Sequence, residues 1–130
     1  MLIVEDNPDD ERLATRTFSA KQRLERYKVA RDGEEGLDIL KAEETPALVL
    51  LDLKLPRLSG VEVLMAMKDD ERLRKVPVVV LTSSDELSDR AACYDLGCNA
   101  FVRKPIDYDE YKRELTTTLD FWLGVNLTVE

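Results

Sequence analysis

Residues 47–52, Ala-Leu-Val-Leu-Leu-Asp, form a continuous apolar run that ends on an acid. Similar apolar runs extend from Met1 to Val4 and from Pro77 to Leu81, and each is closed by a polar or acidic residue. Continuous apolar runs, as opposed to alternating ones, are typical of strands that are covered on both faces. Weaker runs at residues 27–31 and 99–103 complete a set of five predicted strands.

Each run is followed by a segment with helical spacing. The first such segment has Asn7 as a candidate N-cap, Pro8 at the first helical position and acids in the first turn. The fourth is expected to open at Ser84 or Asp85, with Gly97 as a C-cap just beyond its end. We expect one stripe of each predicted helix to face the core. In chain order, the stripes of the five helices are marked by Leu13, Ala14, Thr17 and Phe18; by Leu37 and Leu40; by Val61, Leu64, Met65 and Lys68; by Leu87, Ala91 and Tyr94; and by Tyr111, Leu115, Leu119 and Trp122.

Strict alternation of strand and helix predicts an α/β fold with a parallel sheet and helices on both faces, because parallel strands need crossover connections. A length of 130 residues is typical of one domain. In open sheets of this kind, ligands bind outside the carboxyl ends of the strands. The residues that follow the predicted strands are therefore the candidate site.

The composition disfavours several classes of function. A net charge of -8 disfavours binding to nucleic acid and to anionic membranes. The chain has no histidine, which excludes histidine-based acid/base catalysis and histidine metal ligands. It has no apolar run near the roughly 20 residues of a membrane span and no secretory signal, so we expect a cytoplasmic protein with Cys93 and Cys98 as buried thiols.

Polar side chains follow four of the five predicted strands: Glu5, Asp6, Asp52, Thr82, Arg103 and Lys104. Because the carboxyl ends of parallel strands meet at one edge, we expect these side chains to converge. Three adjacent carboxylates repel one another, so such a cluster either raises a carboxyl pKa or holds a hard divalent cation. Oxygen ligands without histidine or thiolate favour Mg²⁺.

The chain resembles the receiver domain of two-component response regulators, of the stand-alone type. The motifs that carry the resemblance cover essentially the whole chain in order, and they are Val4-Glu5-Asp6-Asn7-Pro8, Leu50-Leu51-Asp52-Leu53-Lys54-Leu55-Pro56, Ser59-Gly60, Val80-Leu81-Thr82-Ser83 and Phe101-Val102-Arg103-Lys104-Pro105. The resemblance implies a doubly wound, flavodoxin-like sheet of order 2-1-3-4-5. It also implies a receiver domain at residues 1–122 and a C-terminal extension of the same domain at residues 123–130.

The resemblance further implies a function. The protein would accept a phosphoryl group from a sensor histidine kinase onto Asp52, forming 4-aspartylphosphate, and would signal through a change in its surface. It would be no enzyme beyond catalysing its own phosphorylation and dephosphorylation. Asp6, Asp52 and the Lys54 carbonyl would hold Mg²⁺, which Mn²⁺ can replace, while Glu5 would act through a water. Side chains at Lys54 and Ser84 would tune the loss of the phosphoryl group.

The resemblance also implies a switch formed by Thr82 and Phe101. Thr82 and Lys104 would bind phosphoryl oxygens. Movement of Thr82 would leave space that the aromatic ring of Phe101 fills by turning inward. Because Phe101 has no hydroxyl, we expect this inward turn to cost less than it would for a tyrosine. The bond between Lys104 and Pro105 is expected to be cis, which is accessible essentially only before proline.

The C-terminal residues have a different pattern. Val125, Leu127 and Val129 alternate with polar residues, which predicts an extended chain, and Phe121 and Leu123 fall off the helix stripe. Two alternatives follow: an arm that packs across a homodimer, or a segment that folds back on its own last helix. The candidate dimer or output surface comprises Phe121, Trp122, Val125 and Leu127. Together with the motifs at residues 5–8, 55–57 and 82–84, residues 121–123 look like the regulators paired with bacterial phytochromes, which would make the kinase a red-light sensor.

Other functions remain as alternatives. A haloacid-dehalogenase-type phosphatase also uses an aspartate nucleophile and Mg²⁺, but it needs a second acid where this chain has Lys54. A flavodoxin-like FMN binder needs a phosphate-binding loop where Glu5 and Asp6 would repel the phosphate. A receiver scaffold that is never phosphorylated is the third, and the intact set of site residues argues against it.

Overall fold

Five parallel strands form the centre of the computed structural model, which describes residues 1–20, 26–42, 44–84 and 86–128. The sheet has the order β2-β1-β3-β4-β5, which confirms the predicted fold and strand order. The strands are β1 (Leu2–Val4), β2 (Lys28–Ala30), β3 (Val49–Leu51), β4 (Val78–Thr82) and β5 (Ala100–Arg103). Every residue of β1, β3 and β4 is buried, as expected for continuous apolar runs covered on both faces.

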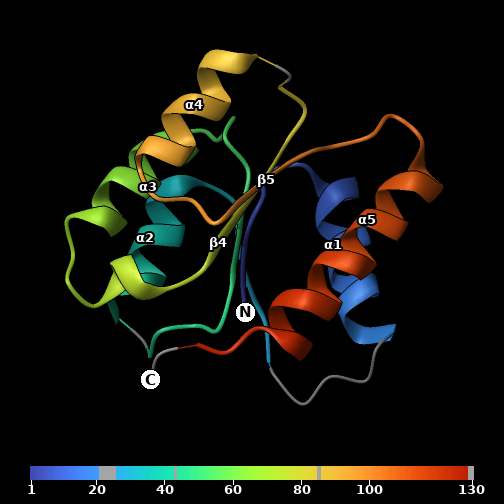
Figure 1. Ribbon diagram of the computed structural model, residues 1–130, viewed down its shortest axis with the longest axis horizontal. Helices are drawn as coiled ribbons and strands as arrows, with labels where there is room; N and C mark the ends of the chain where they lie inside the picture. The colour runs from blue at the N-terminus through green and yellow to red at the C-terminus, as the bar shows by residue number, and fades with distance from the viewer. Residues whose placement is uncertain (21–25, 43, 85, 129–130) are drawn as a thin grey trace.

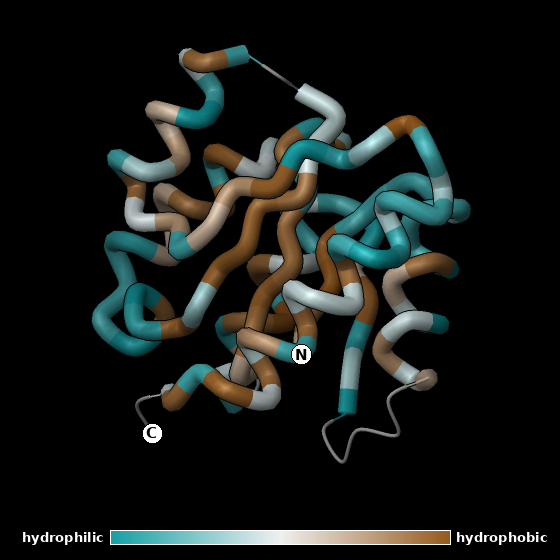
Figure 2. Tube along the Cα trace, turned by 45° about the vertical axis from the view of Figure 1, so that its right-hand side comes forward, coloured by the Kyte–Doolittle hydropathy of each residue, from teal (hydrophilic) through white to brown (hydrophobic). Residues whose placement is uncertain are grey.

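Helices cover both faces of the sheet (Figure 1). On one side lie α1 (Pro8–Ala20) and α5 (Tyr108–Asp120), and on the other lie α2 (Gly33–Ala42), α3 (Gly60–Lys68) and α4 (Leu87–Asp95). A short 3₁₀ turn, η1 (Leu73–Lys75), precedes β4. Each layer has its own apolar core, so the hydrophobic strands run through the middle of the molecule between more polar outer segments (Figure 2).

The helix ends follow the predicted capping chemistry. The Asn7 side-chain oxygen accepts hydrogen bonds from the backbone N–H groups of Asp9 (2.9 Å) and Asp10 (3.2 Å), which fixes the start of α1. At the end of α4, Gly97 has a φ of 89°, and the N–H of Cys98 donates to the carbonyl of Cys93 at 3.0 Å. This is a left-handed C-cap at the predicted glycine.

The predicted apolar face of α4 is wrong. Leu87 is 72% exposed and Tyr94 is 50% exposed, while Cys93 is the buried residue of this helix. The helix begins at Leu87 after Glu86, and Asp85 lies outside the described residues. A nine-residue helix with few apolar side chains has no dominant face of its own, so packing against β5 and α3 decides which side is covered.

Part of the predicted stripe of α3 is wrong as well. Met65 and Lys68 are exposed, whereas Val63, Leu64 and Met67 face the core. The helix is apolar around most of its circumference, so its sequence leaves several faces that would suit burial. Contact with α2 selects the face that is buried.

The chain is not yet extended at Val125, where the sequence pattern predicts an extended chain to begin. Residues Phe121–Val125 form a turn of π-helix, η2, and only the described residues after it are irregular. Trp122 and Leu123 pack against the core between α1 and α5, while Phe121 and Val125 are exposed. The remaining chain passes below the sheet towards the start of β3 (Figure 1). Val129 lies outside the described residues.

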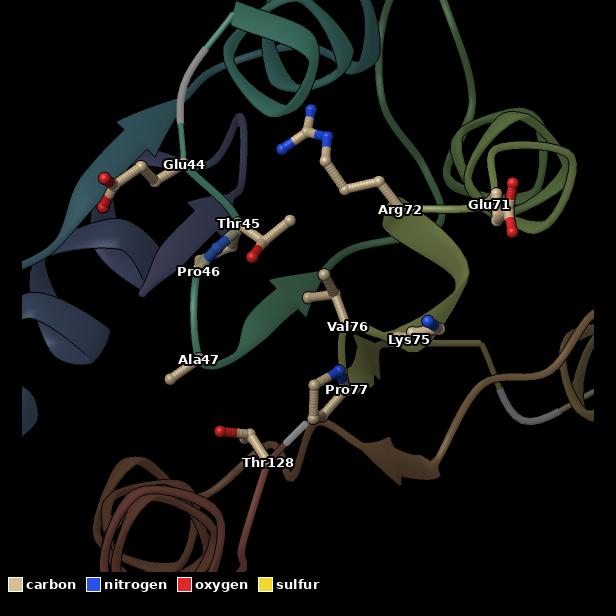
Figure 3. A pocket seen from close by; sticks show the side chains of 10 residues that line it. All are labelled: Glu44, Thr45, Pro46, Ala47, Glu71, Arg72, Lys75, Val76, Pro77 and Thr128. Atoms are coloured by element: carbon tan, nitrogen blue, oxygen red, sulfur yellow. The ribbon is translucent and has the colours of Figure 1, made fainter. Parts of the chain in front are cut away.

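A hollow of about 1100 Å³ lies at the end of the sheet where the strands begin, far from the carboxyl ends of the strands. Figure 3 shows that its walls come from the loops before β3 and β4 and from Thr128 of the C-terminal segment. Arg72 on one wall donates a hydrogen bond to the carbonyl of Leu40 at 2.7 Å, so this side chain closes the end of α2.

Cys93 and Cys98 are both buried free thiols, as predicted. Burial raises the pKa of Cys93 to about 11, so this thiol stays protonated at neutral pH. Within the described residues, no helix is both long enough and apolar enough to span a bilayer.

We expect Gly60→Ala to destabilise the protein. A Cβ at this position would lie 2.3 Å from the carbonyl oxygen of Asp52 and 2.7 Å from Cα of Leu53, and both are backbone atoms. The start of α3 would have to move away from the loop after β3, at a cost of about 1–3 kcal/mol in urea unfolding. The control is Gly124→Ala, where a Cβ would meet nothing within 4 Å. Equal stability of the two variants would contradict this account.

Candidate functional site

Three carboxylates meet at the carboxyl edge of the sheet. Glu5 and Asp6 follow β1, and Asp52 follows β3, its neighbour in the sheet. One oxygen from each lies within 4.8 Å of the others, with Glu5 and Asp52 buried and Asp6 exposed. All three donors are carboxylate oxygens, with the Lys54 backbone two residues beyond Asp52, so this set fits a hard divalent cation such as Mg²⁺.

Lys104, at the end of β5, places its ammonium group among these acids. Its Nζ donates to Glu5 Oε1 at 2.6 Å, to Asp10 Oδ2 at 2.8 Å and to Asp52 Oδ2 at 3.3 Å. The Lys104 side chain is only 9% exposed. One cation therefore serves three carboxylates, and with Asp6 nearby the cluster has an excess of negative charge.

Burial and the neighbouring charges change the pKa values of the site. Burial raises the pKa of Glu5 to about 8, and the Asp52 charge adds to the rise while Lys104 opposes it. Burial lowers the pKa of Lys104, but the charges of Asp52 and Glu5 outweigh this, and its pKa lies above the ordinary value. Lys104 therefore remains a cation under all ordinary conditions.

The backbone around Asp52 is ordered by short-range contacts. Asp52 Oδ1 accepts a hydrogen bond from the N–H of Lys54 at 3.4 Å, while the Lys54 side chain is exposed. The N–H of Asp52 donates to the carbonyl of Val4 at 3.0 Å, which ties β3 to the end of β1. These contacts hold the acid beside Glu5 at the edge of the sheet.

Thr82 and Phe101 lie on the neighbouring strands. Thr82 is fully buried, and its hydroxyl oxygen accepts from the N–H of Ser84 at 3.2 Å. The carbonyl of Thr82 accepts from the N–H of Lys104 at 2.7 Å, so the ends of β4 and β5 are joined directly. Phe101 is half-buried, with the guanidinium carbon of Arg90 in α4 at 5.8 Å from the ring centroid.

Ser84, two residues after Thr82, is also buried and makes a hydrogen bond to α4. Its hydroxyl donates to Asp89 Oδ2 at 2.6 Å and accepts from the N–H of Glu86 at 3.3 Å. Arg103, by contrast, has an exposed position at the end of β5. The structure thus places Ser84 between the end of β4 and the first turn of α4.

The predicted cis bond between Lys104 and Pro105 is wrong for this structure, because no peptide bond of the described residues is cis. A bond before proline favours the trans form by about 0.5–1 kcal/mol. With the trans bond, the Lys104 side chain already contacts Glu5, Asp10 and Asp52.

Two residues of the site were missed at the sequence level. The sequence predicts Asp10 only as an acid in the first turn of a helix, but that turn begins two residues after Asp6 and so lies above the same edge. Tyr111 was assigned to the core stripe of α5, and it does lie buried, lining a small void with Glu5, Asp10 and Asp52. Burial raises the pKa of Tyr111, and the nearby acids add to this rise.

Comparison with known proteins identifies the class. Residues 1–116 match the family described as the response regulator receiver domain, and the chain belongs to this family. It is a phosphoryl-accepting signalling domain of two-component systems. Receiver domains generally signal without being enzymes, and the phosphatase alternative is not favoured.

Individual relatives and solved structures show which members of this family the chain is similar to. The chain is 39% identical over 131 residues to the probable methanogenesis regulatory protein FilR2 of Methanothrix harundinacea, covering 97% of this chain and 84% of that protein. The Mn²⁺-bound form of response regulator Rcp1 has a TM-score of 0.95 at 30% identity, covering 99% of this chain and 97% of the other. The phosphorylated cyanobacterial phytochrome response regulator RcpA has a TM-score of 0.95 at 31% identity, covering 99% and 96%. The structural neighbours therefore include phytochrome-associated regulators, as the sequence motifs predict.

The raised pKa of Glu5 predicts a pH dependence of stability in metal-free protein. In the unfolded chain this carboxyl has a pKa near 4.5, and in the folded protein the pKa is about 8, so the folded state binds the extra proton between these values. Its contribution is present below the unfolded value and is lost as the pH rises to about 8. We expect the free energy of unfolding, measured in urea with a chelator, to fall by roughly 1 kcal/mol or more across this window.

Glu5→Gln provides the control, because it keeps the shape of the side chain and removes the titrating group. Lys104 has its pKa above the ordinary value and does not titrate in this window. A slope that is as steep in Glu5→Gln as in the wild type would show that another group causes it.

Proposed function

We propose that Asp52 is the residue that accepts the phosphoryl group from the phosphohistidine of a sensor histidine kinase. An oxygen of Asp52 forms the new bond to phosphorus while the bond from phosphorus to the kinase histidine nitrogen breaks, and that nitrogen keeps the electron pair. The observation that carries this proposal is the position of Asp52, buried at the carboxyl edge with Nζ of Lys104 at 3.3 Å. The donor histidine has to belong to another molecule, since this chain has none.

The metal would be held by oxygen atoms of Asp6 and Asp52 and by the Lys54 carbonyl, with Glu5 acting through a water. When bound, Mg²⁺ or Mn²⁺ supplies positive charge that offsets the repulsion between these acids and an incoming phosphoryl dianion. The all-oxygen donor set supports this assignment, as does the Mn²⁺-bound form of the similar regulator Rcp1. Lys104 contributes a second positive charge, with its Nζ 3.3 Å from Asp52 Oδ2.

Thr82 and Phe101 would transmit the change to the surface. A phosphoryl group on Asp52 adds roughly -1.5 to -2 charges and three strong acceptors, which attract the Thr82 hydroxyl and Lys104. Movement of Thr82 would loosen the hydrogen bond from the N–H of Ser84 and open space for the Phe101 ring. Lys54 lies two residues after Asp52 and Ser84 lies two residues after Thr82, and we assign both side chains to tuning the loss of the phosphoryl group.

The test is phosphorylation followed by intact mass. Wild-type protein is incubated with Mg²⁺ and acetyl phosphate, or with a phosphorylated histidine kinase, and we expect a gain of one phosphoryl group. Asp52→Asn should gain none, because an amide is no nucleophile here, whereas Asp38→Asn, which alters an exposed acid of α2, should be labelled like the wild type. Equal labelling of wild type and Asp52→Asn would disprove the assignment, and so would repeated turnover of a phosphomonoester.

For the upstream partner, we propose a phytochrome histidine kinase in the cytoplasm. The similarity to the phosphorylated phytochrome response regulator RcpA supports this partner. In the kinase arm of the same experiment, labelling should then depend on the light state of the phytochrome. Labelling that is indifferent to light would remove the support for this partner.

We further propose that the protein forms a homodimer through its C-terminal segment. Phe121, Val125 and Leu127 are 47%, 68% and 92% exposed, and clustered exposed apolar side chains mark interaction surfaces. Trp122 anchors the segment on the core of its own chain, which leaves the other three available to a second copy.

Sedimentation velocity at high micromolar concentration tests the dimer. We expect wild-type protein to be dimeric and the double variant Val125→Ser/Leu127→Ser to be monomeric. The control is Leu87→Ser, which removes another exposed leucine, at 72% exposure, from α4. Monomeric wild-type protein, with and without phosphorylation, would rule out this interface, and dissociation of the control alone would place the interface at α4.

A further inference from the structure

We propose that Asp10 competes with the phosphoryl group for the Lys104 ammonium, and so weakens the binding of that group at Asp52. This inference rests on the proposed role of Asp52 as the acceptor. Asp10 would act through Lys104, which makes it a positioning residue and not a member of the reacting set.

The geometry of Lys104 supports competition. An ammonium group has three N–H donors, and here all three have carboxylate partners. The contact to Asp10 Oδ2, at 2.8 Å, is shorter than the contact to Asp52 Oδ2, at 3.3 Å. Any hydrogen bond that Lys104 donates to a phosphoryl oxygen therefore has to be withdrawn from a carboxylate that already holds it.

Of the three carboxylates that contact Lys104, Asp10 is the one outside the cluster that fits a cation. Glu5 and Asp52 belong to the cluster with Asp6 that fits a cation, and their charges are offset when a cation is bound. Asp10 is not one of that cluster. Its charge would still face Lys104 in the metal-loaded protein, where the other acids are neutralised.

The distance between the carboxylates of Asp10 and Asp52 sets how strongly Asp10 changes the binding constant. Asp10 Oδ2 and Asp52 Oδ2 contact the same nitrogen, at 2.8 and 3.3 Å, so they lie no more than about 6 Å apart. Two like charges at this separation in a partly solvated site repel each other enough to change a binding constant by roughly 3- to 10-fold. The Asp10 side chain is 25% exposed, which limits the effect to this range instead of the larger one of a dry interior.

The fold keeps Asp10 in place. Its N–H donates to the Asn7 cap at 3.2 Å, which fixes the first turn of α1. Tyr111 of α5 is buried and lines the same small void as Asp10, Glu5 and Asp52. The start of α1 therefore fixes the backbone of Asp10, and the Lys104 contact at 2.8 Å fixes its carboxylate.

Asp9 provides a matched control. It precedes Asp10 in the same helical turn, it is exposed, and its carboxylate pairs with Arg12 on the surface. Asp9→Asn removes the same charge from the same helix start without contact to Lys104. Any effect of the charge on the helix dipole is therefore common to both variants.

The experiment measures the affinity of the phosphoryl mimic beryllofluoride at saturating Mg²⁺, followed by fluorine and amide NMR. We expect Asp10→Asn to bind beryllofluoride roughly 3- to 10-fold more tightly than the wild type, because the competing charge is gone. Asp9→Asn should stay within about twofold of the wild type, and Asp10→Glu, which keeps the charge, should not show the gain. The difference between Asp10→Asn and the wild type should shrink in 0.5 M salt, since screening weakens the repulsion.

Equal affinity of Asp10→Asn and Asp9→Asn would overturn the inference, and so would weaker binding by Asp10→Asn, which would mean that Asp10 supports Lys104. If Asp10 had a purely structural role, its replacement could only lower the affinity for beryllofluoride. A gain in affinity therefore distinguishes competition from a structural role. Asp10→Ser serves as a second neutral variant if Asp10→Asn folds poorly by circular dichroism. Failure of the proposed function has a different outcome: wild-type protein would not bind the mimic, or Asp52→Asn would bind it equally well.

Discussion

Repulsion between carboxylates at one edge of the sheet is the constraint on which the rest of this structure depends. Glu5, Asp6 and Asp52 gather there because β1 and β3 are neighbours that run in the same direction. Lys104 can offset part of this charge only because β5 ends at the same edge, two strands away from β3. Burial raises the pKa of Glu5 and the Asp52 charge adds to the rise, while the remaining excess of negative charge makes the site a receptor for cations. Phosphorylation adds further negative charge to this edge, where negative charge is already in excess.

The apolar interior holds these charges together against their repulsion. Strands β1, β3 and β4 are buried along their whole length, with one helical layer on each face. The close approach of Gly60 to the Asp52 carbonyl lets α3 start directly beside the loop that carries the acid. The site is therefore built at the end of a buried sheet, while Thr82 and Phe101 connect it to α4, in which Cys93 is the buried residue.

Much of the fold could be predicted because continuous apolar runs and helix caps are local features. The runs that contain Val49 and Val79 are typical of buried strands, and Asn7 and Gly97 mark helix ends by their own conformational preferences. The faces of α3 and α4 could not be predicted, because a helix with apolar residues on several sides takes its buried face from its neighbours. The π-helical turn after α5 reaches Val125, where the alternating pattern predicts extended chain, because packing of Trp122 and Leu123 on the core continues the helical path of α5.

The sequence by itself determined the order of the elements and the set of acids, hydroxyl and lysine that follow the strands, because strand ends in a parallel sheet share one edge. Only the tertiary structure decided that Asp10 and Tyr111 join this set, and that Lys104 contacts Asp10 more closely than Asp52. Asp10 is 94 residues from Lys104 in the chain. Contacts between residues so distant depend on how α1 packs beside α5 on one face of the sheet, and local sequence patterns do not encode that packing.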